Sequence, residues 1–332
     1  MPADGLSGPS FRPPRWLRHP DLQSILPSFP LRRPGVRRRC ASLLRSSVDC
    51  VLDCGEGVRL LGHASPPPRR RDPPQLAILL HGWEGSGQSL YVLTLGQYLH
   101  EHGFDVFRLN LRDHGDSHHL NPGIFHSCLL PEVLGAVREL ERLYPAHRRA
   151  MVGFSLGGNF ALRVGAALPP GSAALARIVA ISPVLDPQAT LEALEGGRLL
   201  YRRYFMGKWR RSLRRKQKAW PAQYDFANLS ELTNLAQMTE ALVLRHTPYP
   251  SLRDYLGGYA ITGAALRTLG IPSHIIASRD DPIIPVEDLS RLHASPFLSI
   301  TQTAHGGHCG FRERLLGTPW LDRFVLELLA GE

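Results

Sequence analysis

The chain has 332 residues, a formal net charge of +10, 43% hydrophobic and 20% charged residues. This is the composition of a globular protein with one large domain or two small ones, and no apolar run approaches the about 20 residues that cross a bilayer. The N-terminal residues carry no secretory signal pattern, and the five cysteines are an odd number scattered along the chain, so we expect a cytoplasmic protein with reduced thiols.

The excess positive charge is concentrated in two segments, residues 12–39 and residues 198–218. Such segments bind anionic lipid surfaces or nucleic acid, or they simply form a solvated basic surface. No nucleic-acid-binding motif or aromatic interleaving accompanies them, so we do not expect nucleic acid as a partner. Peripheral contact with an anionic membrane stays open.

The N-terminal segment, residues 1–45, is rich in Pro and Arg, and its apolar residues predict an arm that packs on the body, with a short helix at 21–26. Alternating polarity over residues 46–65, interrupted by Gly55 and Gly57, predicts an antiparallel hairpin.

Strands and helices then alternate along the chain. Apolar runs predict strands at residues 76–80, 104–111, 149–154, 176–181, 273–277 and 298–302. Helical spacing predicts helices at residues 90–102, 129–143 and 286–293, and a last helix that ends near 329. This rhythm indicates an α/β protein with a mostly parallel central sheet that helices cover on both faces.

The rhythm stops between residues 186 and 270, where the pattern is helical, charged and rich in aromatic residues. We interpret this segment as a helical cap inserted between two strands. The predicted division is therefore an arm at 1–45, a first core part at 46–185, the cap at 186–270 and a second core part at 271–332.

The most informative motif is Gly153-x-Ser155-x-Gly157, which has a strand pattern before it and a helix pattern after it. A sharp strand-to-helix turn of this kind exposes the serine hydroxyl as a nucleophile, and the glycines allow close backbone approach. The amide of Leu156 at the helix start can stabilise an oxyanion. The alternative is a glycine-rich turn with an inert serine.

A serine nucleophile needs a histidine base, and the histidine needs a carboxylate that orients it. Two adjacent acids, Asp280 and Asp281, follow one late strand, and two histidines, His305 and His308, follow the next. Asp281 starts a rigid Asp-Pro turn and His308 is flanked by glycines, so both are favoured, but the pattern leaves both pairs open.

The loop after the strand at 76–80 is rich in glycine, and the amide of Trp83 in it is the expected second oxyanion donor. A histidine-rich run, residues 113–119, with His126 beyond it, could supply metal ligands. Because a serine triad needs no metal, we expect this run to line or brace the pocket. No metal and no cofactor are predicted.

Several stretches together resemble the YheT-like branch of the α/β-hydrolases, which includes ABHD-type carboxylesterases and lipases. They are His81-Gly82-Trp83-Glu84-Gly85-Ser86, Phe107-Arg108-Leu109-Asn110-Leu111-Arg112-Asp113-His114-Gly115-Asp116-Ser117, Leu120-Asn121-Pro122-Gly123-Ile124-Phe125-His126-Ser127, Gly153-Phe154-Ser155-Leu156-Gly157-Gly158-Asn159, Asp280-Asp281-Pro282, Gly306-Gly307-His308-Cys309-Gly310-Phe311 and, near the N-terminus, Pro13-Pro14-Arg15-Trp16-Leu17-Arg18-His19-Pro20-Asp21-Leu22-Gln23-Ser24. The resemblance covers about residues 11–325. It implies an α/β-hydrolase fold and carboxylic-ester hydrolysis, with Ser155 as nucleophile, Asp281 as acid and His308 as base. The family's usual Leu in the first stretch is Trp83 here, which leaves the size of the acyl pocket open.

We therefore expect a serine hydrolase that cleaves short- or medium-chain acyl esters, acylglycerols or other lipids through an acyl-enzyme. An acyltransferase that uses the same triad is a variant of this expectation. The alternative from another class is a non-catalytic module of the same fold that binds lipid surfaces or a partner.

Overall fold

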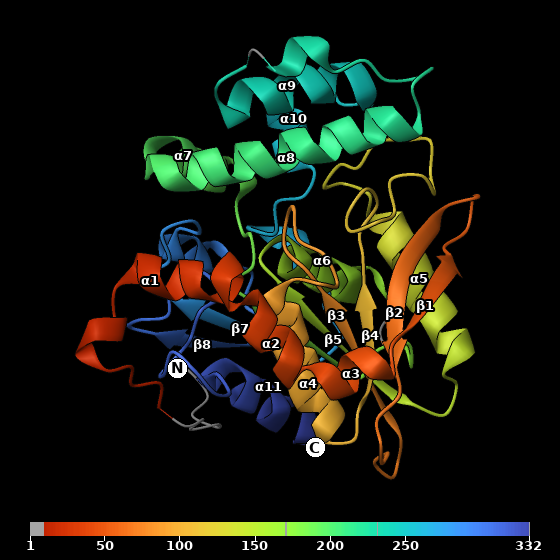
Figure 1. Cartoon of the computed structure of the whole chain (residues 1–332), viewed down its shortest axis with the longest axis vertical. Coiled ribbons are helices and arrows are strands. Elements are labelled where there is room, and N and C mark those ends of the chain that lie inside the picture. The colour runs from red at the N-terminus through yellow and green to blue at the C-terminus, as the bar shows by residue number, and fades with distance from the viewer. Residues whose placement is uncertain (1–9, 170, 231, 332) are drawn as a thin grey trace.

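The computed structural model describes residues 10–169, 171–230 and 232–331, and its centre is an eight-stranded sheet (Figure 1). Its strands are β1 (Val48–Asp53), β2 (Arg59–Ser65), β3 (Gln75–Leu80), β4 (Asp105–Leu109), β5 (Arg148–Phe154), β6 (Arg177–Ile181), β7 (Ser273–Ser278) and β8 (Leu298–Thr303). Their order is β1-β2-β4-β3-β5-β6-β7-β8. β1 and β2 form the antiparallel edge, and the strands from β4 to β8 run parallel.

Helices cover both faces of this sheet. The helices are α1 (Pro20–Ile25), α2 (Arg33–Arg39), α3 (Ala41–Arg45), α4 (Leu90–Glu101), α5 (Leu130–Leu143), α6 (Leu156–Ala167), α7 (Pro187–Gly196), α8 (Leu199–Ala219), α9 (Leu235–His246), α10 (Leu252–Gly257) and α11 (Trp320–Ala330). α5 and α6 pack together on one face, and α4 and α11 pack together on the other. α7 to α10 lie between β6 and β7 in the chain and sit above the sheet in Figure 1.

The sheet separates two apolar cores because side chains alternate along each strand. In β3, Leu76, Ile78 and Leu80 belong to the core on the α5–α6 side, while Ala77 and Leu79 belong to the core on the α4–α11 side. A strand that is buried on both faces needs a continuous apolar run, which is what β3 has.

The predicted α/β fold, with its mostly parallel sheet and inserted helices, is confirmed. One element differs in type: residues Val286–Arg291 form a 3-10 helix, where an α-helix was expected. The segment has six residues and follows directly on Pro285, so it is too short to form a regular helix of several turns.

The N-terminal arm contains two helices, α2 and α3, that the sequence analysis did not predict. Val36, Cys40 and Leu43 are their buried residues, at intervals of four and three, which is the spacing of one helical face. This apolar face packs on α4. The eight arginines at residues 12–39 make the segment look irregular in the sequence.

Among the described residues, no helix has both the length and the apolar character needed to cross a bilayer. All five cysteines are free thiols, including Cys50 and Cys54 in the β1–β2 hairpin.

Candidate active site

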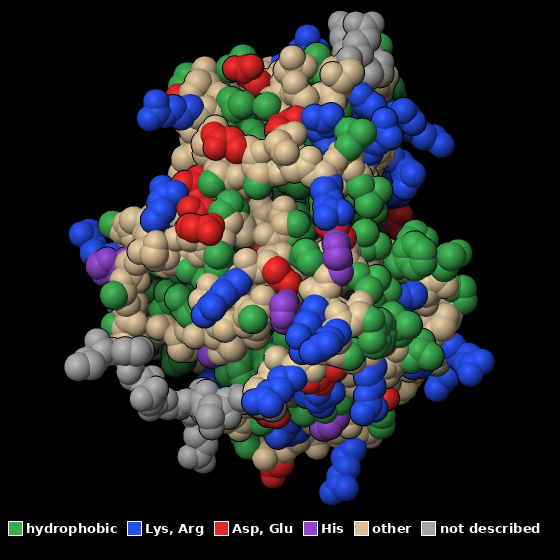
Figure 2. All heavy atoms as spheres, turned by 90° about the vertical axis from the view of Figure 1, so that its left-hand side faces the viewer, with side chains coloured by type: hydrophobic (Ala, Val, Ile, Leu, Met, Phe, Trp, Pro, Cys, Tyr) green, Lys and Arg blue, Asp and Glu red, His purple; other side chains and the backbone are tan. Residues whose placement is uncertain are grey.

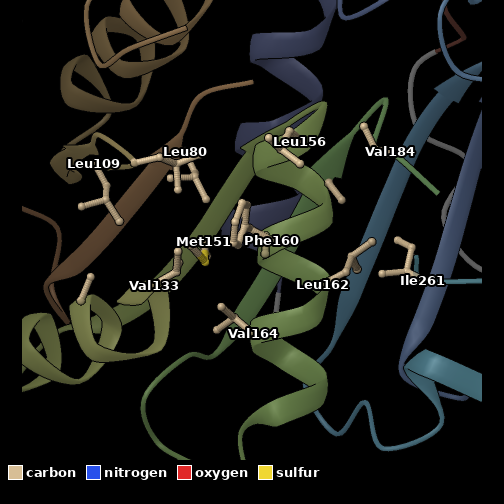
Figure 3. Packing of buried hydrophobic residues seen from close by; sticks show 14 of the residues in the cluster. Leu80, Leu109, Val133, Met151, Leu156, Phe160, Leu162, Val164, Val184 and Ile261 are labelled. Atoms are coloured by element: carbon tan, nitrogen blue, oxygen red, sulfur yellow. The ribbon is translucent and has the colours of Figure 1, made fainter. Parts of the chain in front are cut away.

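Ser155 lies at a sharp turn between β5 and α6, with φ of 53° and ψ of −118°. This conformation is rare for a residue with a side chain. The turn is possible only because positions 153 and 157 are glycines, which have no side chain. A Cβ at Gly153 would lie 2.1 Å from Gly157 O, and one at Gly157 would lie 2.5 Å from His81 O. Below the turn, Phe160 of α6 lies against Met151 of β5 in the core (Figure 3). The sequence thus folds into a strained elbow on a rigid base.

A cavity of about 1000 Å³ opens beside this turn. Ser155, Leu156, Trp83 and His308 all line it, although they come from three separate regions of the chain. Residues of α7, α8 and α9 complete its wall, so the inserted helices and the sheet enclose it together. Its volume is at the upper end of the range for small-molecule sites.

His308 is paired with Asp281. The distance from His308 Nδ1 to Asp281 Oδ2 is 2.9 Å, and the two side chains are 12% and 3% exposed. The other carboxylate oxygen, Oδ1, accepts hydrogen bonds from the backbone N–H groups of Ile283 and Ile284 at 2.9 and 3.0 Å. Asp281 is therefore fixed, and it directs Nε2 of the imidazole away from itself.

The rival residues, Asp280 and His305, form a looser pair outside the cavity. His305 Nδ1 lies 3.4 Å from Asp280 Oδ2, and the side chains are 36% and 18% exposed. Asp280 Oδ1 instead accepts the backbone N–H of Gly307 at 2.8 Å. Neither residue is among those described as lining the cavity. Asp280 thus supports the loop that carries His308.

Two backbone amides are available near Ser155. The N–H of Leu156 is the first of α6 and has no acceptor within the helix. Among the described residues, no hydrogen bond occupies the N–H of Trp83. The loop of Trp83 passes close to Ser155, because a Cβ at Gly82 would lie 3.1 Å from Ser155 Cβ. An oxyanion site requires backbone N–H groups that are free in this way.

Two titratable groups of the cavity have shifted pKa values. Burial opposes a charged imidazole at His308, but the Asp281 carboxylate and Cys309 together outweigh it and raise the pKa of His308 well above its ordinary value. Burial also raises the pKa of Glu84 to about 7, against an opposing effect of the Lys208 ammonium. The cavity thus holds a base that protonates readily and a carboxyl that is partly neutral near pH 7.

The N-terminal arm supports the histidine loop, which the sequence analysis missed. Gln23 is fully buried, and its amide donates to Leu17 O and Arg312 O and accepts from Arg312 N. Ser24 Oγ accepts the backbone N–H of His308 at 2.8 Å. The clue in the sequence was two polar residues on a short helix whose motif resembled the family, but nothing in it pointed to their partners.

The histidine-rich run braces the inserted helices. Asp113 Oδ1 accepts a 2.8 Å hydrogen bond from Lys216 of α8, and both side chains are buried. His118 Nε2 lies 2.9 Å from Ser212 Oγ, also on α8. His114 Nε2 accepts the backbone N–H of Glu84 at 3.2 Å. Each group therefore has a partner within the protein, as expected of a bracing loop.

The chain belongs to the alpha/beta hydrolase family, whose model matches residues 77–315. It is 25% identical over 274 residues to YheT of Escherichia coli (strain K12), which is named as an esterase, covering 79% of this chain and 78% of that protein. It is 24% identical to the phospholipase ABHD3 of Mus musculus, covering 71% of this chain and 58% of that protein. It is 23% identical to the monoacylglycerol lipase ABHD2 of Danio rerio, covering 75% and 63%.

Solved structures share the fold. An esterase of Pyrococcus furiosus, Pf2001, superposes with a TM-score of 0.55 at 16% identity, over 88% of this chain and 93% of that one. A 2,6-dihydroxy-pseudo-oxynicotine hydrolase superposes with a TM-score of 0.53 at 17% identity, over 93% and 77%. The resemblance to the YheT-like branch is thereby confirmed at the level of family and fold.

Proposed function

We propose that this chain is a serine esterase whose triad is Ser155, His308 and Asp281. That the chain is a carboxylic-ester hydrolase follows from its family and from relatives named as an esterase, a phospholipase and a lipase. The observation that supports the triad most strongly is the buried 2.9 Å pair of His308 and Asp281, because His308 lines the same cavity as Ser155.

In the proposed reaction, Ser155 Oγ attacks the ester carbonyl while His308 Nε2 takes its proton. The amides of Trp83 and Leu156 donate to the oxyanion of the tetrahedral intermediate. His308 then gives the proton to the leaving alcohol, and an acyl-enzyme forms at Ser155. Water, activated by the same imidazole, hydrolyses the acyl-enzyme and restores the serine.

The substrate class we propose is an uncharged ester with a short or medium acyl chain, including acylglycerols. Apolar side chains dominate the cavity wall, and Val184, Leu191, Leu194, Phe205 and Ile283 are among them. Such a wall favours an acyl chain by burying its methylene groups, at about 0.8 kcal/mol for each.

Kinetics on a series of p-nitrophenyl esters test this proposal. Ser155→Ala should lose at least about 10³-fold in kcat, since the nucleophile cannot be replaced by the rest of the site. An unchanged kcat in Ser155→Ala would contradict the nucleophile assignment. A wild-type enzyme that shows no chain-length preference would contradict the acyl-pocket assignment alone.

We also propose that the rim of the cavity touches an anionic membrane. Leu200 lines the cavity and is 57% exposed, and Leu31, next to the cavity-lining Pro30, is 82% exposed. The exposed side chains of Arg33 and Arg211 line the same cavity. On the face drawn in Figure 2, Lys and Arg side chains extend from both the upper and the lower part of the molecule. Exposed apolar and basic groups together fit an anionic lipid surface.

Co-sedimentation with vesicles of phosphatidylserine and phosphatidylcholine tests the membrane contact. Binding should weaken as salt rises, and the double variant Leu31→Glu/Leu200→Glu should abolish it. The control is Leu244→Glu on α9, since Leu244 is 54% exposed but is not among the cavity residues. Absence of binding at low salt, or equal loss in the control, would overturn this second proposal.

A further inference from the structure

Helix α8 lies against the loop that supplies the proposed oxyanion donor. The Trp83 ring stacks on Phe205, with centroids 5.4 Å apart and planes at 16°, and meets the edge of Trp209 at 5.1 Å. Lys208 Nζ donates a 2.8 Å hydrogen bond to the backbone oxygen of Glu84. Residues three and four apart share one side of a helix, so a single side of α8 makes all three contacts.

The same loop also donates two backbone N–H groups to side chains outside α8. The Tyr91 hydroxyl accepts the N–H of Gly82 at 3.1 Å, and His114 accepts the N–H of Glu84 at 3.2 Å. Trp83 lies between Gly82 and Glu84. Its side chain packs against α8, and no hydrogen bond to another described residue occupies its N–H. Glu84 has φ of 54°, a conformation that persists only where the surroundings hold it.

We propose that Phe205, Lys208 and Trp209 are positioning residues that hold the Trp83 amide where it donates to the oxyanion. Helix α8 would then be part of the catalytic apparatus as well as a wall of the cavity. The inference rests on the proposed serine-esterase function. It concerns kcat, because an oxyanion donor acts in the transition state and contributes little to ground-state binding.

The size of the effect follows from what the donor does. Losing one oxyanion donor costs about 10²- to 10³-fold in kcat. Moving it, while keeping it in the chain, should cost less. We therefore expect about a 10- to 100-fold loss of kcat in Trp209→Ala and in Phe205→Ala, with KM changed by less than about threefold.

The matched control is Trp220→Ala, which truncates the same residue type at the end of the same helix. The Trp220 indole donates to the backbone oxygen of His118 and has no ring contact with Trp83 among the described residues. It should keep kcat within about threefold of the wild type. Conservative replacement by Trp209→Phe should restore most of the kcat lost in Trp209→Ala, since it keeps an aromatic edge for Trp83.

A double-mutant cycle tests whether Trp209 acts through Trp83. In a Trp83→Leu background, Trp209→Ala should lower kcat by less than about threefold further, because the contact it removes is already gone. If the two single effects multiply in full, Trp209 acts independently of Trp83 and the inference is overturned.

Circular dichroism gives the temperature at which each variant begins to melt, and the ester kinetics are measured below that temperature. If an aromatic variant does not fold, Lys208→Met decides, because it leaves every ring that contacts Trp83 in place and removes the hydrogen bond to Glu84 O together with the ammonium charge. A kcat lowered by about three- to tenfold at unchanged KM supports the inference. An unchanged kcat in all folded variants, or a change confined to KM, overturns it. Failure of the serine-esterase proposal would look different, since the wild type itself would not hydrolyse esters or Ser155→Ala would remain active.

Discussion

The backbone N–H of His308 donates a 2.8 Å hydrogen bond to Ser24 Oγ, across 284 positions of sequence. The loop and helix α1 are in close contact there, because a Cβ at Gly307 would lie 2.4 Å from Pro20 O and one at Gly310 would lie 2.4 Å from Gln23 O. The N-terminal arm is thus a support for the proposed catalytic base. The arm has this role through these contacts and not through its basic charge alone.

Gly310→Ala should separate the histidine loop from α1. The added methyl group would clash with the backbone oxygen of Gln23. We therefore expect a loss of about 1–3 kcal/mol in the free energy of unfolding, and a lower kcat. The control is Gly35→Ala in α2, where nothing lies within 4 Å of the added Cβ. Chemical denaturation and ester kinetics measure both variants, and equal behaviour of the two would argue against the support role.

Asp281→Asn and Asp280→Asn should differ strongly. Asp281 is hydrogen-bonded to the His308 ring, so its replacement should lower kcat by about 10³- to 10⁴-fold, as loss of the orienting carboxylate does in serine triads. Asp280 bonds only to the loop backbone and the half-buried His305 among the described residues, so its replacement should cost less than about tenfold. Steady-state kinetics decide, and the opposite ranking would exchange the roles of the two acids.

The pH profile of kcat/KM should report the raised pKa of His308. The neutral imidazole is the active base, so activity is present above the folded pKa and is lost as pH falls through it. Because the Asp281 carboxylate raises that pKa, the acid limb should lie above the ordinary histidine value of about 6.5.

Two variants separate this limb from other ionisations. His305→Ala should leave it in place, since His305 is outside the cavity-lining residues described. Glu84→Gln should also leave it in place, which distinguishes His308 from the cavity carboxyl whose pKa is about 7. If the acid limb disappears in Glu84→Gln, it belongs to Glu84, and its assignment to His308 is contradicted.

Lys216→Met should loosen the inserted helices. The Lys216 ammonium is buried and donates to Asp113 Oδ1, Asn121 O and Gly123 O. Its removal leaves a buried carboxylate without its cation, at a cost of about 3–5 kcal/mol. Lys218→Met, two residues along α8 at an exposed position, is the control and should be neutral. Thermal denaturation compares the two, and similar melting temperatures would contradict the bracing role of Asp113.

Most of the fold could be predicted from the sequence, but only part of the candidate site could. β3 and β5 could be predicted because strands buried on both faces need apolar runs, and the Ser155 turn because only glycine fits at positions 153 and 157. The acids at 280 and 281 could not be separated by pattern, since neighbours in one turn differ only in where each points. Contacts such as Ser24 with His308 depend on the folded chain, and no local periodicity encodes them. The assignment of Ser155, Asp281 and His308 stays a prediction.

Labelling with a fluorophosphonate, followed by mass-spectrometric mapping of the modified residue, tests the central claim most directly. We expect a single phosphonylated site at Ser155 in the wild type, with labelling slowed by at least about 100-fold in His308→Ala, because the base is needed to activate the hydroxyl. Modification at another residue, or a rate that is unchanged in His308→Ala, would contradict it.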